Sequence, residues 1–218
     1  NTDGGTLIEE ITQEYDTEIT APTDPVKEGY TFTGWDISVP TTMPSSDMTI
    51  TALWAINPYT ITFSTDGGTV IEAITQDFDT NITVPADPVK EGHTFIGWDV
   101  SIPTNMPSSD ITITALWSIN SYTITFDTDG GTVVDEITQD YDTVITPPLD
   151  PEKEGYTFVG WDVSIPTTMP SNDMTITALW AINPYTITFN TDGGTVIETI
   201  LQDYNTAITA PEDPVKEG

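Results

Sequence analysis

Apolar and polar residues alternate along short segments of this chain, and each such segment recurs. Residues 122–126 read Tyr-Thr-Ile-Thr-Phe and residues 174–180 read Met-Thr-Ile-Thr-Ala-Leu-Trp, so every second residue is apolar. This period of two predicts half-buried β-strands. Residues 156–165 predict another strand, and residues 132–143 predict one with a weaker pattern. Because no segment has the period of a long amphipathic helix, we expect a mostly-β fold.

Glycine and proline separate the predicted strands. The sequence Asp129-Gly130-Gly131 predicts a turn, because glycine adopts positive φ and an Asp side chain can bond its own backbone. Residues 145–155 are rich in proline, which cannot donate to a sheet ladder, so they predict an extended connection. Residues 166–173 begin with proline and predict another turn.

The whole pattern repeats along the chain. The sequence Thr-Asp-Gly-Gly-Thr recurs with its first glycine at Gly4, Gly67, Gly130 and Gly193, so each step is 63 residues. This period exceeds the ~20–50 residues typical of solenoids, so each repeat is expected to be a small domain of its own. The expected domains are a partial repeat without its first strand, two complete repeats of about four strands, and a partial repeat without its second half, at residues 1–58, 59–121, 122–184 and 185–218.

The connections between repeats are short. Only Ser-Ile-Asn-Ser lies between Trp117 and Tyr122, and no flexible Gly/Ser tether is present. Successive repeats should therefore be held in a fixed relation, as a rod-like array.

The charge balance excludes several partners. The chain has 35 acidic residues, 4 lysines and a formal net charge of −31. Nucleic acid needs a basic surface, so it is excluded as a partner, and so is simple docking on anionic lipid. The chain has no cysteine and no apolar run near the ~20 residues of a membrane span, so we expect neither disulfides nor membrane insertion.

Two tryptophans recur in every repeat that reaches them. One follows glycine and the other closes the sequence Thr-Ala-Leu-Trp. A domain of this size needs large aromatic side chains to build a core, so we expect structural tryptophans rather than a sugar-stacking platform. The predicted core tryptophans are Trp35, Trp54, Trp98, Trp117, Trp161 and Trp180.

Closely spaced carboxylates beside glycine resemble the start of a calcium loop. One candidate is the Asp-Thr-Asp-Gly-Gly segment and the other is Gln-Asp-Tyr-Asp-Thr, although neither has the downstream glutamate of an EF-hand. A plain Asp-Gly turn is the competing interpretation. The candidate calcium ligands are Asp66, Asp127, Asp129, Asp140 and Asp142.

The remaining candidate groups favour no chemistry. The single histidine, His93, stands where other repeats have tyrosine, so no repeated catalytic arrangement is visible and we expect no enzyme. Each repeat carries one lysine in the sequence Lys-Glu-Gly, which predicts a solvated turn rather than an isopeptide crosslink. Threonines alternate along the strands and predict a polar outer face, with a glycan-binding ladder as the alternative.

The ordered markers Gly130-Gly131, Gly155-Tyr156-Thr157-Phe158, Gly160-Trp161 and Leu179-Trp180 together resemble the Listeria–Bacteroides repeat, the B-repeat of internalin-like surface proteins. The resemblance implies a β-grasp-like fold, in secreted or wall-attached prokaryotic proteins, and a role as spacer or adhesion module. Family members commonly have a basic residue before the last tryptophan, where this chain has Leu179. That difference, with the acidic composition, argues against heparin-like ligands.

The expected function is a non-enzymatic extracellular structural repeat protein of a prokaryotic cell surface, forming a stiff stalk or filament. Its partners would be neighbouring repeats or copies of itself. The partial repeat at residues 185–218 begins with a strand that the partial repeat at residues 1–58 lacks, so head-to-tail strand complementation is a further hypothesis. The candidate donor residues are Tyr185, Ile187 and Phe189. The alternative is a multivalent module that binds glycan or host protein.

Overall fold

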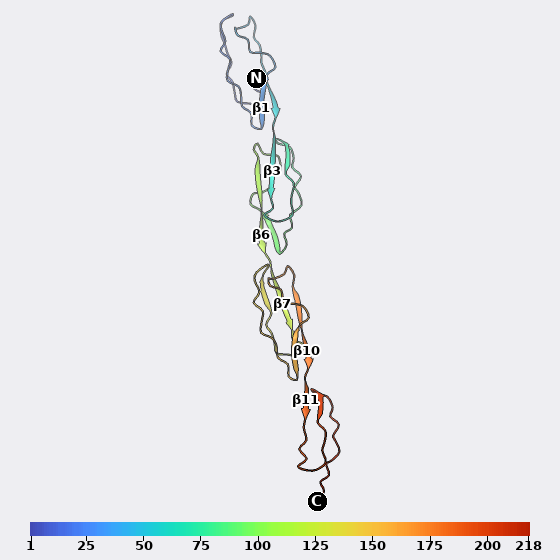
Figure 1. The fold of residues 1–218 in the computed structure, drawn as a ribbon. Helices are drawn as coiled ribbons and strands as arrows, with labels where there is room; N and C mark the ends of the chain where they lie inside the picture. Colours follow the sequence, from blue (N-terminus) through green and yellow to red (C-terminus); the bar gives the residue numbers. More distant parts are fainter. The chain divides into compact units, whose positions relative to one another are not determined.

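The computed structural model describes residues 1–218 and contains twelve β-strands and no helix (Figure 1). The chain divides into two compact units. Unit 1 comprises residues 1–90 and 94–118, and unit 2 comprises residues 91–93 and 119–218. The mostly-β fold with repeated small sheets, predicted from the alternating pattern, is confirmed.

Unit 2 contains one complete four-stranded sheet, with strand order β8-β7-β10-β9. The first strand, β7, and the last, β10, run parallel at its centre, while β8 and β9 pair antiparallel on the outside. This arrangement is the β-grasp-like one that the resemblance implies. The strands are β7 (Ser121–Asp127), β8 (Ile137–Asp140), β9 (Tyr156–Trp161) and β10 (Met174–Ile182). A two-stranded sheet follows, made of β11 (Pro184–Ile187) and β12 (Ile200–Asp203).

Unit 1 contains the same four-stranded sheet in the order β4-β3-β6-β5, with β3 and β6 parallel. Its strands are β3 (Pro58–Ser64), β4 (Ile74–Asp77), β5 (His93–Trp98) and β6 (Ile111–Ile119), of which His93 and Ile119 belong to unit 2. A two-stranded antiparallel sheet precedes it, made of β1 (Tyr30–Trp35) and β2 (Ala52–Ile56).

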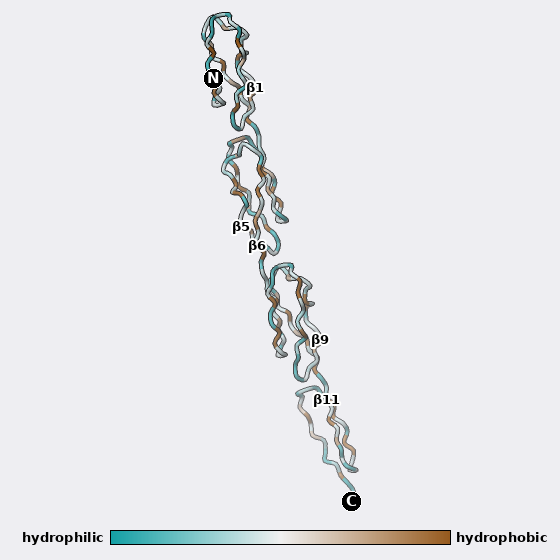
Figure 2. The backbone as a smooth tube through the Cα atoms, turned by 90° about the vertical axis from the view of Figure 1, so that its left-hand side faces the viewer, coloured by the Kyte–Doolittle hydropathy of each residue, from teal (hydrophilic) through white to brown (hydrophobic).

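The core of each complete sheet lies on one face of the central parallel strands. Buried residues alternate with exposed or partly exposed threonines along β7 and β10, as a half-buried strand requires. In unit 2 the core comprises Ile124, Phe126, Ile145, Met169 and Ile176, and in unit 1 it comprises Ile61, Phe63, Met106 and Ile113. Figure 2 shows brown, hydrophobic stretches that alternate with teal, hydrophilic ones along the backbone.

The strand lengths differ from those expected. The second strand covers only residues 137–140 of the predicted 132–143, and the third ends at Trp161. The last strand runs past Trp180 to Ile182, because Ala181 and Ile182 still pair with β9. A single residue, Asn183, therefore separates β10 from β11, and Asn57 likewise separates β2 from β3.

Candidate functional site at the repeat junctions

The Thr-Asp-Gly-Gly segment is a tight hydrogen-bonded turn. Asp129 and Gly130 both have positive φ, at 47° and 86°, and the amide of Gly131 donates to the carbonyl of Thr128 at 3.0 Å. Positive φ at both central positions is the pattern of a type I′ turn, which favours Asp-Gly. The predicted turn is confirmed, with aspartate as well as glycine in the left-handed region.

The closing tryptophan of each repeat packs on this turn. The indole Nε1 of Trp180 donates to the carbonyl of Thr128 at 3.0 Å. A Cβ on Gly131 would lie only 2.7 Å from Cζ2 of Trp180, so the ring needs a glycine there. Trp54 and Trp117 make the same contacts with their own turns, whereas Trp98 and Trp161 pack against the cores; all six tryptophans are partly buried.

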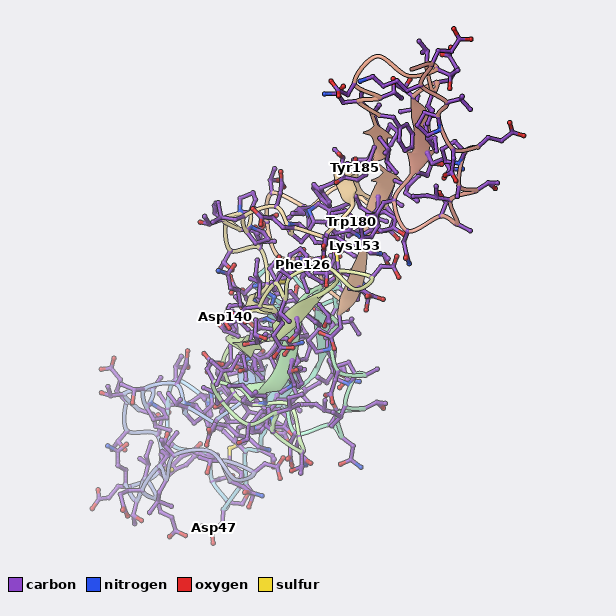
Figure 3. All side chains as sticks on the ribbon, turned by 90° about the horizontal axis from the view of Figure 1, so that it is seen from below. Asp47, Phe126, Asp140, Lys153, Trp180 and Tyr185 are labelled. Carbon is purple, nitrogen blue, oxygen red and sulfur yellow. The ribbon has the colours of Figure 1, made fainter.

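The lysine side chain is enclosed by the turn and by aromatic rings, which contradicts the solvated turn expected from Lys-Glu-Gly. Nζ of Lys153 donates to the carbonyl of Asp129 at 2.5 Å and lies 3.4 Å from its carboxylate. It also lies 4.6 Å from the ring centroid of Tyr156 and 5.6 Å from that of Trp180. Figure 3 labels Lys153 and Trp180. We call this arrangement the lysine cage. Its physical basis is that the aliphatic stem packs on the rings while the ammonium meets oxygen atoms and ring faces.

The candidate calcium ligands lie in these turns. Asp66 and Asp129 face the ammonium groups of Lys90 and Lys153, at 3.6 and 3.4 Å. Asp127 accepts a hydrogen bond from the amide of Asp129. A cation therefore already faces the carboxylate of the first candidate segment.

The second candidate segment is also a turn. The carbonyl of Asp140 accepts hydrogen bonds from Thr143, and Asp142 has a φ of 61°. No group of three or more His, Asp or Glu side chains lies close enough to hold a metal ion. Calcium binding stays a prediction, which titration calorimetry would test.

Successive repeats meet at a junction built from three segments. In unit 2, the ring of Tyr204 lies flat on Gly155: a Cβ there would be 2.1 Å from Cγ of the ring. The amide of Asn183 donates to the carbonyl of Gly155, and the amide of Tyr204 donates to the carbonyl of Asn183, both at 2.9 Å. The side chain of Asn183 also accepts from Thr157 at 2.6 Å. A single linker residue thus bonds the repeats on both sides of it.

Unit 1 contains the same junction. The ring of Phe78 covers Gly29, where a Cβ would lie 2.1 Å from Cδ1 of that ring. The amide of Asn57 donates to Gly29 and the amide of Phe78 donates to Asn57, again at 2.9 Å. The edge-to-face contact between two rings is also preserved. The ring centroids of Tyr30 and Phe78 lie 6.1 Å apart, as do those of Tyr156 and Tyr204.

A separate contact ties the glutamate of Lys-Glu-Gly to the following repeat. Ser108 Oγ donates to Glu28 at 2.6 Å in unit 1. Within unit 2, Ser171 Oγ donates to Glu91 at 2.8 Å. Tyr141 also covers Gly92, as Tyr204 covers Gly155. The ring of His93 meets the edge of Tyr141, in the position that Tyr156 has beside Tyr204. The site therefore recurs once per junction.

The junction tyrosines hold their protons more tightly than usual. The carboxylate of Glu154, followed by partial burial, raises the pKa of Tyr204 above its ordinary value of 10.0. Burial, followed by the carboxylate of Glu91, raises the pKa of Tyr141 in the same direction. Both shifts follow from the cost of placing a phenolate beside a carboxylate in a partly desolvated site.

This junction was not predicted from the sequence, although a signal for it exists. The glycine of Lys-Glu-Gly and the aromatic residue of Gln-Asp-Tyr-Asp-Thr each recur once per repeat. Nothing in the alternation of apolar residues indicates that they touch across repeats, because they lie 49 positions apart.

The candidate strand donors lie at the start of the last half-repeat. Tyr185 and Ile187 belong to β11, pair with β12 and are exposed, while Phe189 lies just beyond the strand and is partly buried. Residues 1–50 form a groove of about 670 Å³ lined by Ile8, Ile19, Trp35, Met43 and Ile50, among others. In the complete repeats the residues equivalent to Met43 are Met106 and Met169, each 1% exposed beside β3 or β7.

Comparisons with known proteins agree with the repeated architecture. The Listeria-Bacteroides repeat domain matches residues 1–52, 59–115, 122–178 and 185–218. A "Putative Gly-rich membrane protein" of Evansella cellulosilytica is 35% identical over 99% of this chain and 28% of its own length. Internalin H of Listeria monocytogenes is 42% identical over 37% of this chain and 16% of its own length. The chain thus spans less than a third of these curated relatives.

A solved structure of SHIRT domains 3–4 from a streptococcal cell surface protein is 18% identical and covers 59% of this chain and 99% of its own. Its TM-score of 0.23 is too low to establish a common fold. The structure contains no apolar helix of membrane-spanning length. The four family matches together cover nearly all of the sequence, and the third includes the markers Gly130-Gly131, Gly155-Tyr156-Thr157-Phe158 and Gly160-Trp161. The chain belongs to the Listeria-Bacteroides repeat domain family.

Proposed function

We propose that this chain is a non-enzymatic structural segment of an extracellular prokaryotic surface protein, in which fixed junctions between repeats make a stiff stalk. The observation that carries this proposal is the junction itself. A one-residue linker, an aromatic ring on a buried glycine and a serine–glutamate contact hold each joint at separate points. Separate contacts resist bending in more than one direction, which a flexible tether cannot do.

The relatives and the charge support the surface location. Curated relatives carry names of membrane proteins and of an internalin, which supports an envelope location for this chain. A net charge of −31 keeps the chain soluble and repels neighbouring copies. A spacer in an adhesin needs both properties.

The surroundings of the single histidine favour a structural role over catalysis. The ring of His93 contacts the backbone carbonyl of Glu91 and the edge of Tyr141. This is the junction position that tyrosine occupies elsewhere, so the ring serves packing. No nucleophilic side chain is placed by these contacts.

The stalk is tested by distance measurements across one junction. The chain has no cysteine, so Val133→Cys and Val196→Cys, at equivalent positions of successive repeats and 88% and 83% exposed, accept spin labels cleanly. Pulsed electron paramagnetic resonance should give a narrow distance distribution that broadens in Tyr204→Ala. The matched control is Tyr15→Ala, because Tyr15 is the same repeat position but is 71% exposed. A distribution as broad in the parent chain as in Tyr204→Ala would contradict the stalk.

The binding-module alternative gains less from the structure. Every Trp, Tyr and Phe of residues 59–183 is at least partly buried, so neither complete repeat presents an exposed ring for a sugar to stack on. The outward threonines pair with each other, as Thr123 and Thr138 do at 2.8 Å. A glycan array that shows specific binding would revive this alternative.

A further inference from the structure

The lysine cage and the repeat junction share an aromatic ring. In unit 2, Tyr156 lies under the ammonium of Lys153 on one side and meets the edge of Tyr204 at 6.1 Å on the other. In unit 1, Tyr30 lies 4.4 Å from Nζ of Lys27 and 6.1 Å from Phe78. The ring that faces the lysine is therefore the ring against which the next repeat packs.

The lysine also connects two turns that lie 24 positions apart in the sequence. Its ammonium donates to the Asp129 carbonyl, while its own carbonyl accepts from the amide of Tyr156 at 3.1 Å. Gly155 lies between Lys153 and Tyr156 and accepts the hydrogen bond from Asn183. A movement of the Lys153 side chain would therefore displace the glycine on which Tyr204 lies.

The lysines of the repeats that contain the closing tryptophan are largely enclosed. The side chains of Lys27, Lys90 and Lys153 are only 21–23% exposed. The side chain of Lys216, whose Nζ lies 3.3 Å from the Asp192 carboxylate, is 61% exposed.

We propose that the lysine cage couples the interior of a repeat to its junction with the next repeat, in the two repeats where the lysine faces Tyr30 or Tyr156. Removal of the ammonium leaves the turn carbonyl and the tyrosine face without their partner, so the closing tryptophan and the junction loosen together. The inference rests on the proposed stalk and adds the residue that controls the rigidity of each joint.

The test uses Lys153→Met and Lys27→Met in the full chain, since Met keeps the unbranched apolar stem and removes the charge. Hydrogen exchange at neutral pH is followed by nuclear magnetic resonance at three protons per cage. For Lys153 they are the indole N–H of Trp180 and the amides of Asn183 and Tyr204. Loss of a cation–ring contact should speed exchange at all three by about fivefold to tenfold.

The two variants control each other. Lys27→Met should speed exchange at the Trp54 indole, Asn57 and Phe78, and should leave the three protons of unit 2 unchanged. Lys216→Met should change none of the six, because Lys216 lies outside both cages. Faster exchange at Trp180 alone, with Asn183 and Tyr204 unchanged, would overturn the coupling but leave the stalk intact, since the spin-label distances test the junction separately.

If a lysine variant unfolds its repeat, the proposal can still be tested in the parent chain. In the parent chain, coupled opening requires that the Trp180 indole and the Asn183 and Tyr204 amides share one opening free energy at increasing urea. Three independent opening free energies at these sites would overturn the proposal without any substitution.

Discussion

Single residues with unusual requirements determine how each repeat closes. Gly131 has no Cβ because the ring of Trp180 occupies that space, and Asp129 adopts the positive φ that the turn needs. Lys153 places a charge between oxygen atoms and two aromatic faces. The sequence identified these residues as special, but assigned the lysine to solvent because a Glu and a Gly follow it.

Lysine reactivity should report the cage directly. Under limiting acetic anhydride, Lys216 should acetylate faster than Lys27, Lys90 and Lys153, because its side chain is 61% exposed against 21–23%. Peptide mass spectrometry separates the four sites. Equal rates at all four lysines would show that the rings do not protect the amine.

The glycine under the closing tryptophan should be intolerant of a methyl group. Gly131→Ala should lower the free energy of unfolding by about 1–3 kcal/mol, the usual cost of overpacking, because its Cβ would lie 2.7 Å from Trp180. The matched control is Gly194→Ala, since a Cβ on Gly194 would lie 3.2 Å from the carbonyl of Thr191 and meet no tryptophan, whereas the carbonyl that a Cβ on Gly131 would meet, that of Glu152, lies at 3.1 Å. Urea unfolding measures both, and an equal loss in the two variants would contradict the role of the ring.

At the scale of the elements, the positions where strands end set the length of the linker between repeats. The last strand of the sheet extends to Ile182, and one residue later the next strand begins. Pattern analysis placed the strands but shortened this one, because the two residues after Trp180 carry no alternation signal. Their strand character comes from cross-strand pairing with Tyr156 and Thr157.

The junction should weaken in alkaline solution. The folded-state pKa of Tyr204 and Tyr141 is raised above 10.0, so their contribution is fully present below pH 10 and is lost as pH rises through the folded value. Thermal unfolding midpoints between pH 9 and pH 11.5 should fall more steeply for the parent chain than for Tyr141→Phe/Tyr204→Phe. Phenylalanine is accepted at this position, because Phe78 occupies it in unit 1 and cannot titrate. Parallel pH profiles for the parent chain and the double variant would show that the two tyrosines do not cause the alkaline loss of stability.

At the scale of the whole molecule, the net charge opposes folding. Each complete sheet buries a small core, and the chain carries a net charge of −31 with only four cations. All four cations are already paired with aspartate. The remaining carboxylates repel one another in the folded state.

Salt should therefore stabilise the protein. Raising sodium chloride from about 10 mM to about 500 mM shortens the screening length from ~30 Å to a few Å. The midpoint of thermal unfolding should rise accordingly, whereas equal osmolarity of a neutral solute such as sucrose provides the control for non-ionic effects. A midpoint that does not respond to sodium chloride would show that the carboxylates are too far apart to matter.

The sequence by itself determined the class of fold, the 63-residue repeat, the turns and the family, because these depend on local periodicity and on residues with special backbone preferences. Only the tertiary structure decided where the lysine goes, which tryptophan packs on the core and which on the turn, and that an aromatic ring lies on the glycine of the preceding repeat. Those facts depend on contacts between residues up to 80 positions apart, as for Ser171 and Glu91. No local pattern encodes such a contact, since it exists only when the sheets are formed and the one-residue linker brings their ends together.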